Sequence, residues 1–161
     1  MNSDIFLHIS TLNQTLEIII NSEITKSYLV STAKNGKGEN KDSQCTPCGW
    51  HQIRAKIGGL QPLNSVFVAR RSTGEIYNAE LAKKFPNRDW ILTRILWLDG
   101  LEVRKNRYGN VHTASRYIYI HGSPDDLIQG TAQSHGCIRM KNLDIADLFE
   151  RIQIRTKVYI D

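Results

Sequence analysis

The chain has 161 residues, of which 40% are hydrophobic, and carries 21 Lys+Arg against 16 Asp+Glu for a formal net charge of +5. A chain of this length buries roughly two-thirds of its unfolded surface, so we expect a single domain over residues 1–161 that needs neither disulfides nor metal, and a second full domain is excluded. The positive charges are scattered; they ease the approach to any polyanion without selecting one, and we expect no nucleic acid partner.

The N-terminal residues do not have the pattern of a secretory signal. Residues 1–4 carry no Lys or Arg, and polar residues soon interrupt the apolar stretch that follows. The longest apolar runs, such as residues 18–20, are far shorter than the ~20 residues that span a bilayer. We therefore expect no signal peptide in this chain and no integral membrane segment.

The first part of the chain has the alternation of β-strands. Between residues 5 and 32, apolar residues recur at every second position, and Asn13-Gln14 and Asn21-Ser22 provide turn residues. Residues 34–43 contain no apolar side chain and are predicted to form a mobile surface loop. Short strands are expected again over residues 52–57 and 65–69.

Two helices and three further strands are predicted downstream. Apolar residues recur at helical spacing between residues 74 and 85, and Pro86 ends the pattern. Residues 91–98 are predicted as a strand followed by a turn at Gly100, and residues 117–120 as a short strand whose end delivers His121 into a loop.

The C-terminal part predicts an amphipathic helix over residues 142–152, with Asn142 as its N-cap, and a final strand over residues 157–160. The chain thus has many strands, about two short helices and no βαβ alternation. This pattern favours a mainly β fold, a sandwich or barrel, over a parallel α/β sheet.

The residues with the greatest chemical potential lie in one short segment and at one upstream histidine. The sequence Ser134-His135-Gly136-Cys137-Ile138-Arg139 combines a thiol, an imidazole and a guanidinium, and His121-Gly122 precedes it. A free thiol, with a pKa of ~8.5, is only a few per cent ionised at neutral pH. A histidine within hydrogen-bond reach can take its proton and later return it to a leaving amine, which suits acyl transfer.

The glycine and the arginine of this segment extend that interpretation. Gly136 permits a sharp turn in which consecutive backbone N–H groups can face a developing oxyanion. Arg139 could hold a substrate carboxylate through two parallel hydrogen bonds. Each residue also has an ordinary structural explanation: a buried cysteine, a surface histidine, and an arginine in a salt bridge.

A metal site is an alternative explanation of the same residues. His112, His121, His135 and Cys137 could supply four ligands to zinc, as in a zinc hydrolase. No paired-ligand spacing accompanies them, and Arg139 would lie unfavourably close to a dication, so we expect neither a metal nor a cofactor.

The other cysteines form a single C-x-x-C, Cys45-Thr46-Pro47-Cys48. One such motif does not make a structural zinc site, and no strand-then-helix context supports a redox motif. We interpret it as structural, with a short disulfide as an option in an oxidising compartment.

Together these residues resemble the YkuD-type L,D-transpeptidase catalytic domain. Ile120-His121-Gly122-Ser123, Gly130 and Ser134 to Met140 are similar to the family's His-Gly-Thr and Ser-His-Gly-Cys-Ile-Arg-Met signature, with Ser123 where Thr is common. Weaker similarities extend over nearly the whole chain: Val30-Ser31-Thr32, Thr46-Pro47-Cys48-Gly49, which resembles Thr-Pro-x-Gly, and Leu148-Phe149 before a Val-containing terminal strand.

The resemblance implies a β-sandwich-like fold of mixed sheets and an enzyme that acts on peptidoglycan stem peptides. Cys137 would attack the carbonyl of the third stem residue, release the terminal D-alanine, and pass the acyl group to an amine acceptor. His121 would be the base, oriented by the carbonyl of Gly122.

The resemblance further implies that Ser134, His135 and Gly136 serve the oxyanion hole or the substrate, with backbone N–H groups near residues 135–137 as the oxyanion donors. It implies that Arg139 supports the loop or the substrate carboxylate. It leads us to expect a location in the cell envelope or periplasm, with a cytoplasmic location as the alternative for a chain without a signal. The functional alternatives are an L,D-carboxypeptidase that hydrolyses the same bond and a non-catalytic module that binds wall peptides.

Overall fold

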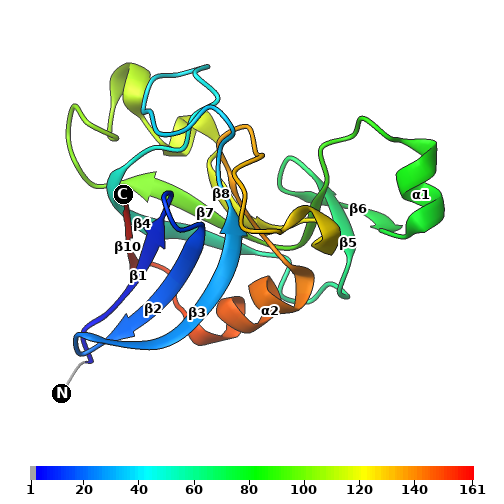
Figure 1. The fold of residues 1–161 in the computed structure, drawn as a ribbon, viewed down its shortest axis with the longest axis horizontal. Coiled ribbons are helices and arrows are strands. Elements are labelled where there is room, and N and C mark those ends of the chain that lie inside the picture. Colours follow the sequence, from blue (N-terminus) through cyan, green and yellow to red (C-terminus); the bar gives the residue numbers. More distant parts are fainter. Residues whose placement is uncertain (1–2) are drawn as a thin grey trace.

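The computed structural model describes residues 3–161 and contains one mixed sheet of ten strands with two α-helices (Figure 1). In chain order the strands are β1 (Ile5–Ser10), β2 (Thr15–Ile20), β3 (Glu23–Ser31), β4 (Gly49–Ile57), β5 (Ser65–Val68), β6 (Arg71–Ile76), β7 (Ile91–Gly100), β8 (Tyr119–Gly122), β9 (Ile138–Met140) and β10 (Lys157–Ile160). The helices are α1 (Ala79–Lys84) and α2 (Asn142–Arg151). The predicted mainly β class with two short helices is confirmed.

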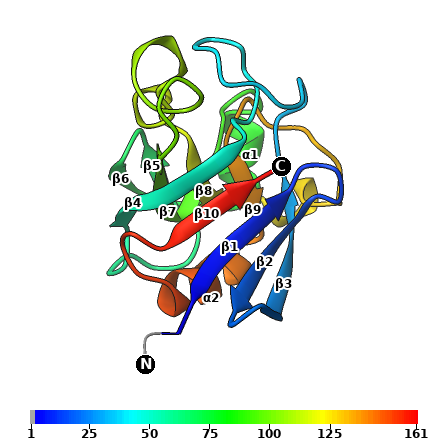
Figure 2. The same cartoon turned by 90° about the vertical axis from the view of Figure 1, so that its left-hand side faces the viewer.

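The sheet closes on itself. Its strand order is β4-β10-β1-β2-β3-β9-β8-β7-β5-β6, and β4 also pairs with β7, so that all strands except β5 and β6 form a ring. Two pairings, β1 with β10 and β8 with β9, are parallel, and the others are antiparallel. Figure 2 shows β4, β10, β1, β2 and β3 side by side. Closure removes the unpaired edges that an open sheet would expose.

Apolar side chains fill the space that the ring encloses. Every second residue of β1, β2, β7 and β8 points inward. The helix α2 lies below the sheet in the view of Figure 1 and contributes its apolar side chains to the same core. The core includes Leu7, Ile9, Leu16, Ile18, Leu96, Leu98, Ile120, Ile138, Ile145 and Leu148, all at most 2% exposed. Within residues 3–161, neither helix is of the length and apolarity needed to cross a membrane.

The turns between the first strands are as predicted. Gln14, Asn21 and Ser22 adopt positive φ angles of 54°, 50° and 68° and link β1, β2 and β3. Residues 34–43 form an exposed connection, as expected for a segment without apolar side chains. The strands predicted over residues 52–57, 65–69, 91–98 and 157–160 correspond to β4, β5, β7 and β10.

The helix predicted over residues 74–85 is wrong in its first half. Residues 71–76 form β6, which pairs with β5, and only residues 79–84 are helical, with Asn78 as the N-cap. Gly74 has φ +83°, a conformation that favours glycine and a bend in the chain. The apolar residues that match one helical period in the sequence therefore belong to two elements, a strand of a hairpin and a short helix.

Three boundaries in the second half of the chain also differ. The predicted turn residue Gly100 is the last residue of β7. Lys141 rather than Asn142 is the N-cap of α2, and Asn142 is the first residue of the helix. The backbone N–H of Asn142 donates to the carboxylate of Asp125 at 2.9 Å. His121 lies within β8 rather than in a loop after it.

Candidate active site

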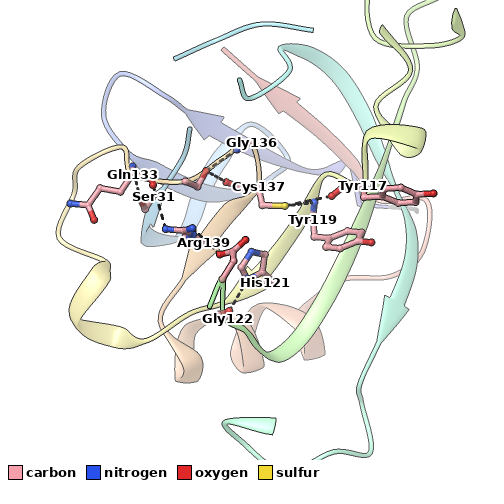
Figure 3. Close-up of polar contacts among 11 residues, drawn as sticks. Ser31, Tyr117, Tyr119, His121, Gly122, Gln133, Gly136, Cys137 and Arg139 are labelled. Carbon is pink, nitrogen blue, oxygen red and sulfur yellow. Dashed lines mark hydrogen bonds and ion pairs between the residues drawn. The ribbon is translucent and has the colours of Figure 1, made fainter. Parts of the chain in front are cut away.

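Two adjacent parallel strands place the predicted catalytic segment. β8 and β9 pair in parallel, with His121 opposite Arg139 and Ile120 opposite Ile138. Successive side chains of a strand point to opposite faces of a sheet, so the two isoleucines enter the core while His121 and Arg139 lie on the outer face. Cys137 immediately precedes β9 and lies near them (Figure 3).

The thiol of Cys137 lies between the backbones of two tyrosines. The backbone N–H of Tyr119 donates to Sγ at 3.4 Å, and the thiol donates to the carbonyl of Tyr117 at 3.5 Å (Figure 3). The Cys137 side chain also packs against the cluster of Phe67, Ile95 and Tyr119. A hydrogen bond from an N–H group favours the thiolate, so Tyr119 supplies one stabilising contact to the form that reacts.

The imidazole of His121 is held in one tautomer. Its Nδ1 donates to the carbonyl of Gly122 at 2.6 Å, which leaves the lone pair on Nε2. Gly122 is required there, because a Cβ would lie 2.5 Å from the carbonyl oxygen of Leu92 and 2.8 Å from Oδ1 of Asn142. The sequence-predicted orientation of His121 by Gly122 thus has a matching contact.

Cys137 and His121 line the same pocket, of about 120 Å³. No hydrogen bond joins the thiol to the imidazole in the part of the chain that the structure describes. Two larger pockets, of about 200 and 270 Å³, flank this one, and His135 lines all three. The pocket of Cys137 shares Asp89 and Arg139 with the first of these and Arg116 and Tyr117 with the second, so an extended ligand has room beyond the thiol.

Burial keeps both groups of the pair neutral in the resting protein. Desolvation raises the pKa of the Cys137 thiol to about 11, and the negative charge of Asp89 acts in the same direction. Desolvation lowers the pKa of His121, partly opposed by its hydrogen bond to Gly122. The resting pair is therefore a thiol and an imidazole, and any attack by Sγ would require removal of the thiol proton.

The turn before Cys137 is built from hydrogen bonds to buried hydroxyls. Ser134 Oγ donates to the carbonyl of Cys137 and accepts the N–H of Gly136 at 3.2 Å. Thr46 Oγ1 donates to the carbonyl of Gly136 and accepts the N–H of Ala33, each at 3.0 Å. Gly136 has φ +131°, where a side chain would be strained. Ser134 and Gly136 therefore shape the turn, and the Gly136 N–H is engaged within it.

Arg139 is held by an ion pair. Its Nη2 lies 2.9 Å from Oδ1 of Asp89, and its Nη1 donates to the carbonyl of Gln133 at 3.4 Å. The Arg139 side chain is 10% exposed, whereas Asp89 is 54% exposed. Of the two roles predicted for Arg139, these contacts correspond to support of the loop. The exposed His135 lies at the junction of the pockets.

Sequence reasoning missed several residues of the site. Asp89, Tyr117, Tyr119 and Arg116 all line or border the pocket, and none belongs to a motif. Arg116 donates to the carbonyls of residues 38, 39 and 45 and to Ser43 Oγ, and so ties the loop before β4 to the rim of the pocket. Of the residues that support the site and were not predicted to belong to it, only Thr46 lies in a sequence motif, the segment similar to Thr-Pro-x-Gly.

The predicted metal and disulfide alternatives have no matching geometry. Within residues 3–161, no three His, Cys, Asp or Glu side chains are grouped in a way that could hold a metal ion. His112 is engaged elsewhere, with its Nδ1 accepting the N–H of Tyr108 at 2.8 Å. Cys45, Cys48 and Cys137 are free thiols, so Cys45 and Cys48 do not form the disulfide considered for an oxidising compartment.

The family model of the L,D-transpeptidase catalytic domain, YkuD, matches residues 4–160 of the chain. A search among curated proteins finds no match.

Solved structures show the same fold. An L,D-transpeptidase from Mycobacterium smegmatis is 14% identical with a TM-score of 0.57, over 99% of this chain and 59% of that one. The L,D-transpeptidase from Xylanimonas cellulosilytica is 15% identical with a TM-score of 0.57, over 100% and 62%. L,D-transpeptidase 3 from Mycobacterium tuberculosis, in complex with a faropenem-derived adduct, is 13% identical with a TM-score of 0.58, over 99% and 61%. The chain thus spans about 60% of the length of these structures.

Proposed function

The chain belongs to the YkuD family of L,D-transpeptidase catalytic domains, and from this premise we propose that it is a cysteine acyl transferase that acts on peptidoglycan stem peptides. In this proposal Cys137 is the nucleophile, His121 is the general base and acid, and Gly122 orients the imidazole. The donor is a peptide that ends in D-alanine, and a second stem peptide supplies the acceptor amine. The corresponding location is the cell envelope.

The observation that carries the proposal is the shared pocket. The Cys137 thiol and the His121 imidazole line one cavity, and the bond from Nδ1 to Gly122 leaves Nε2 as the basic nitrogen. Among the described residues, Nε2 makes no hydrogen bond. A thiol and a base that face one cavity are the minimum requirement for nucleophilic acyl transfer.

The first half-reaction follows from these positions. Nε2 of His121 accepts the thiol proton as Sγ of Cys137 bonds to the carbonyl carbon of the third stem residue. The carbonyl oxygen takes up the negative charge. We assign its stabilisation to the backbone amides of His135 and Cys137, because the amide of Gly136 already donates to Ser134. When the oxyanion collapses, the C–N bond breaks, the imidazolium returns its proton to the leaving amine, and D-alanine departs.

The second half-reaction decides between transferase and hydrolase. An amine that attacks the thioester gives its proton to His121 and forms a new amide, while Cys137 is regenerated. Water in the same position gives L,D-carboxypeptidase action. The two pockets that adjoin the pocket of Cys137 support the transferase, because a donor and an acceptor peptide together need more room than a donor alone.

The direct test is incubation of the protein with a disaccharide tetrapeptide, with and without a second stem peptide as acceptor. We expect release of D-alanine by mass spectrometry, and a cross-linked product when the acceptor is present. Unchanged substrate with folded protein contradicts the proposal. Binding without turnover would identify the chain as a module that only binds wall peptides.

A further inference from the structure

Two arginines, Arg116 and Arg139, line the same pocket as Cys137, and both already have partners. Arg139 pairs with Asp89 at 2.9 Å. Arg116 donates to acceptors of the loop before β4, including the carbonyl of Cys45 at 2.7 Å. Neither guanidinium is therefore free to receive an anionic group of a ligand without breaking a contact that builds the site.

Arg70 differs from both. This residue lies in the turn between β5 and β6, and its Nη1 donates to the hydroxyl of Tyr119 at 2.9 Å. In the described part of the chain this is its only side-chain hydrogen bond, and no carboxylate pairs with it. Because a guanidinium has five N–H donors, Arg70 keeps most of its capacity for a ligand.

Two aromatic rings fix the position of this guanidinium. Its Cζ lies 4.7 Å from the ring centroid of Trp97 and 5.0 Å from that of Tyr117. Contacts of this kind between a cation and aromatic faces are stabilising and reduce the freedom of the arginine side chain. The head group is therefore pre-positioned for an anion, which lowers the entropy lost on binding.

Two tyrosines, Tyr117 and Tyr119, connect Arg70 to the thiol. The backbones of Tyr117 and Tyr119 contact Sγ of Cys137, and their side chains contact Arg70. Tyr117 is 53% exposed, so a ligand in the pocket can continue across it to the guanidinium. The indole of Trp97 also has Arg54 over it, at 4.8 Å, and Arg54 pairs with Asp99 at 3.8 Å.

These contacts favour an anion over a sugar as the group that binds. A sugar stacks on an open aromatic face, but guanidinium groups lie over Trp97 and Tyr117. What the surface offers is positive charge with unused donors, and the planar fork of an arginine matches a carboxylate.

We propose that Arg70, held by Trp97, Tyr117 and Tyr119, is a carboxylate-binding subsite for the donor peptide. This inference rests on the proposed function and adds the group that the enzyme recognises beside the scissile bond. Two carboxylates of a donor tetrapeptide lie beside the scissile bond, one on the side chain of a third residue that carries an acid group and one at the C-terminus of the leaving residue, and the subsite binds one of these two.

Three synthetic donor peptides test the subsite: one with all carboxylates free, one with the third-residue side chain as a carboxamide, and one with a C-terminal carboxamide. In the wild-type protein we expect one of the two amides to raise KM for D-alanine or D-alaninamide release about tenfold, with kcat nearly unchanged. The amide that does so identifies the source of the carboxylate.

The variants then assign the effect to Arg70. Arg70→Gln should raise KM about tenfold for the peptide with all carboxylates free. It should leave KM unchanged for the peptide whose amide identified the bound carboxylate. Arg70→Lys should recover part of the affinity. Arg54→Gln is the matched control, because Arg54 shares the indole but has its own carboxylate, and its KM should stay within about twofold. Equal KM values for all three peptides, or an equal effect of Arg70→Gln on all three, would overturn the subsite.

Binding separates this inference from the proposed function. If the wild-type protein releases nothing from any peptide, the proposed function fails. Calorimetric titration of the same peptides into the Cys137→Ala protein then decides the subsite. About tenfold weaker binding of one amide supports the subsite, and equal or absent binding of all three peptides contradicts it.

Discussion

The reactivity of Cys137 is set by its surroundings more than by its sequence motif. Burial disfavours the thiolate and raises the pKa of the thiol to about 11, while the N–H of Tyr119 partly compensates. Burial also lowers the pKa of His121. The protein therefore does not hold a preformed thiolate and imidazolium, and in the proposed mechanism the thiol becomes nucleophilic only as His121 removes its proton during attack.

This account predicts the pH dependence of alkylation. With a pKa of about 11, the thiolate fraction below pH 10 rises about tenfold per pH unit. We expect the rate of Cys137 modification by iodoacetamide to rise in that way from about pH 7 to 9 without a plateau. Peptide mapping distinguishes Cys137 from Cys45 and Cys48. A plateau at or below neutral pH would show a preformed ion pair and contradict the account.

Single residues of the site were predictable when they lay in a continuous motif. Cys137, His121 and Gly122 could be proposed from the sequence because a thiol, an imidazole and a small residue occur at a recognisable spacing, and the structure places Cys137 and His121 in one pocket. Asp89 and Arg70 could not, since each reaches the site from the region around β5, β6 and α1. Their roles depend on how β5 pairs with β7, which no local pattern specifies.

At the scale of elements, the turn that precedes Cys137 is supported by a residue of the segment before β4. Thr46, just before β4, is fully buried and links the carbonyl of Gly136 to the N–H of Ala33, just after β3. One hydroxyl thus joins three segments that are distant in sequence. Its loss would leave two buried backbone groups without a partner.

We expect Thr46→Val to reduce the free energy of unfolding by about 1–3 kcal/mol, because it removes the hydroxyl at nearly constant volume. Since the Gly136 turn loses its support, kcat for D-alanine release should fall by a larger factor than the factor by which KM changes. Thr46→Ser keeps the hydroxyl and is the control, with activity close to wild type. Chemical denaturation and steady-state kinetics measure both effects, and equal activity of the two variants would contradict the role of Thr46.

Elements were predictable where one period dominated. The alternation in β1, β2 and β10 and the helical face of α2 gave their positions, because each has one face in the core. The segment of residues 74–85 was misread, because a strand and a helix of only six residues follow each other with no buried residue in the helix. The role of Asn142 was also unpredictable. Its side-chain amide donates hydrogen bonds to the carbonyl of Ser123 and the carboxylate of Asp125, and it does not cap α2.

For the whole molecule, the closing contact of the barrel contains a buried histidine. His51 lies on β4 opposite Gly100 of β7. The two ring nitrogens of His51 form hydrogen bonds with the carbonyl of Gly49 and the hydroxyl of Thr113, each at 3.0 Å. Burial lowers the pKa of His51 to about 4. The closing pair of strands therefore holds a neutral imidazole, which the strand pattern alone could not reveal.

This predicts a loss of stability in acid. In the unfolded chain a histidine takes up a proton near pH 6.5, whereas folded His51 does so near pH 4, so its contribution is present above about pH 6.5 and is lost as the pH falls toward 4. The loss from this residue should be roughly 3 kcal/mol. Urea unfolding between pH 7 and 4 measures it, and His51→Gln should flatten this part of the profile. His112→Gln, which removes a partly exposed ring, is the control. An unchanged slope in His51→Gln contradicts the account.

The central claim, that Cys137 forms a covalent acyl-enzyme, is tested most directly by the mass of the intact protein. After brief mixing with a tetrapeptide donor, we expect a species heavier than the free protein by the donor minus D-alanine. The added mass should map to Cys137, decay when an acceptor amine is supplied, and be absent from the Cys137→Ala variant. Release of D-alanine by the Cys137→Ala protein, or an adduct on another residue, would contradict the claim.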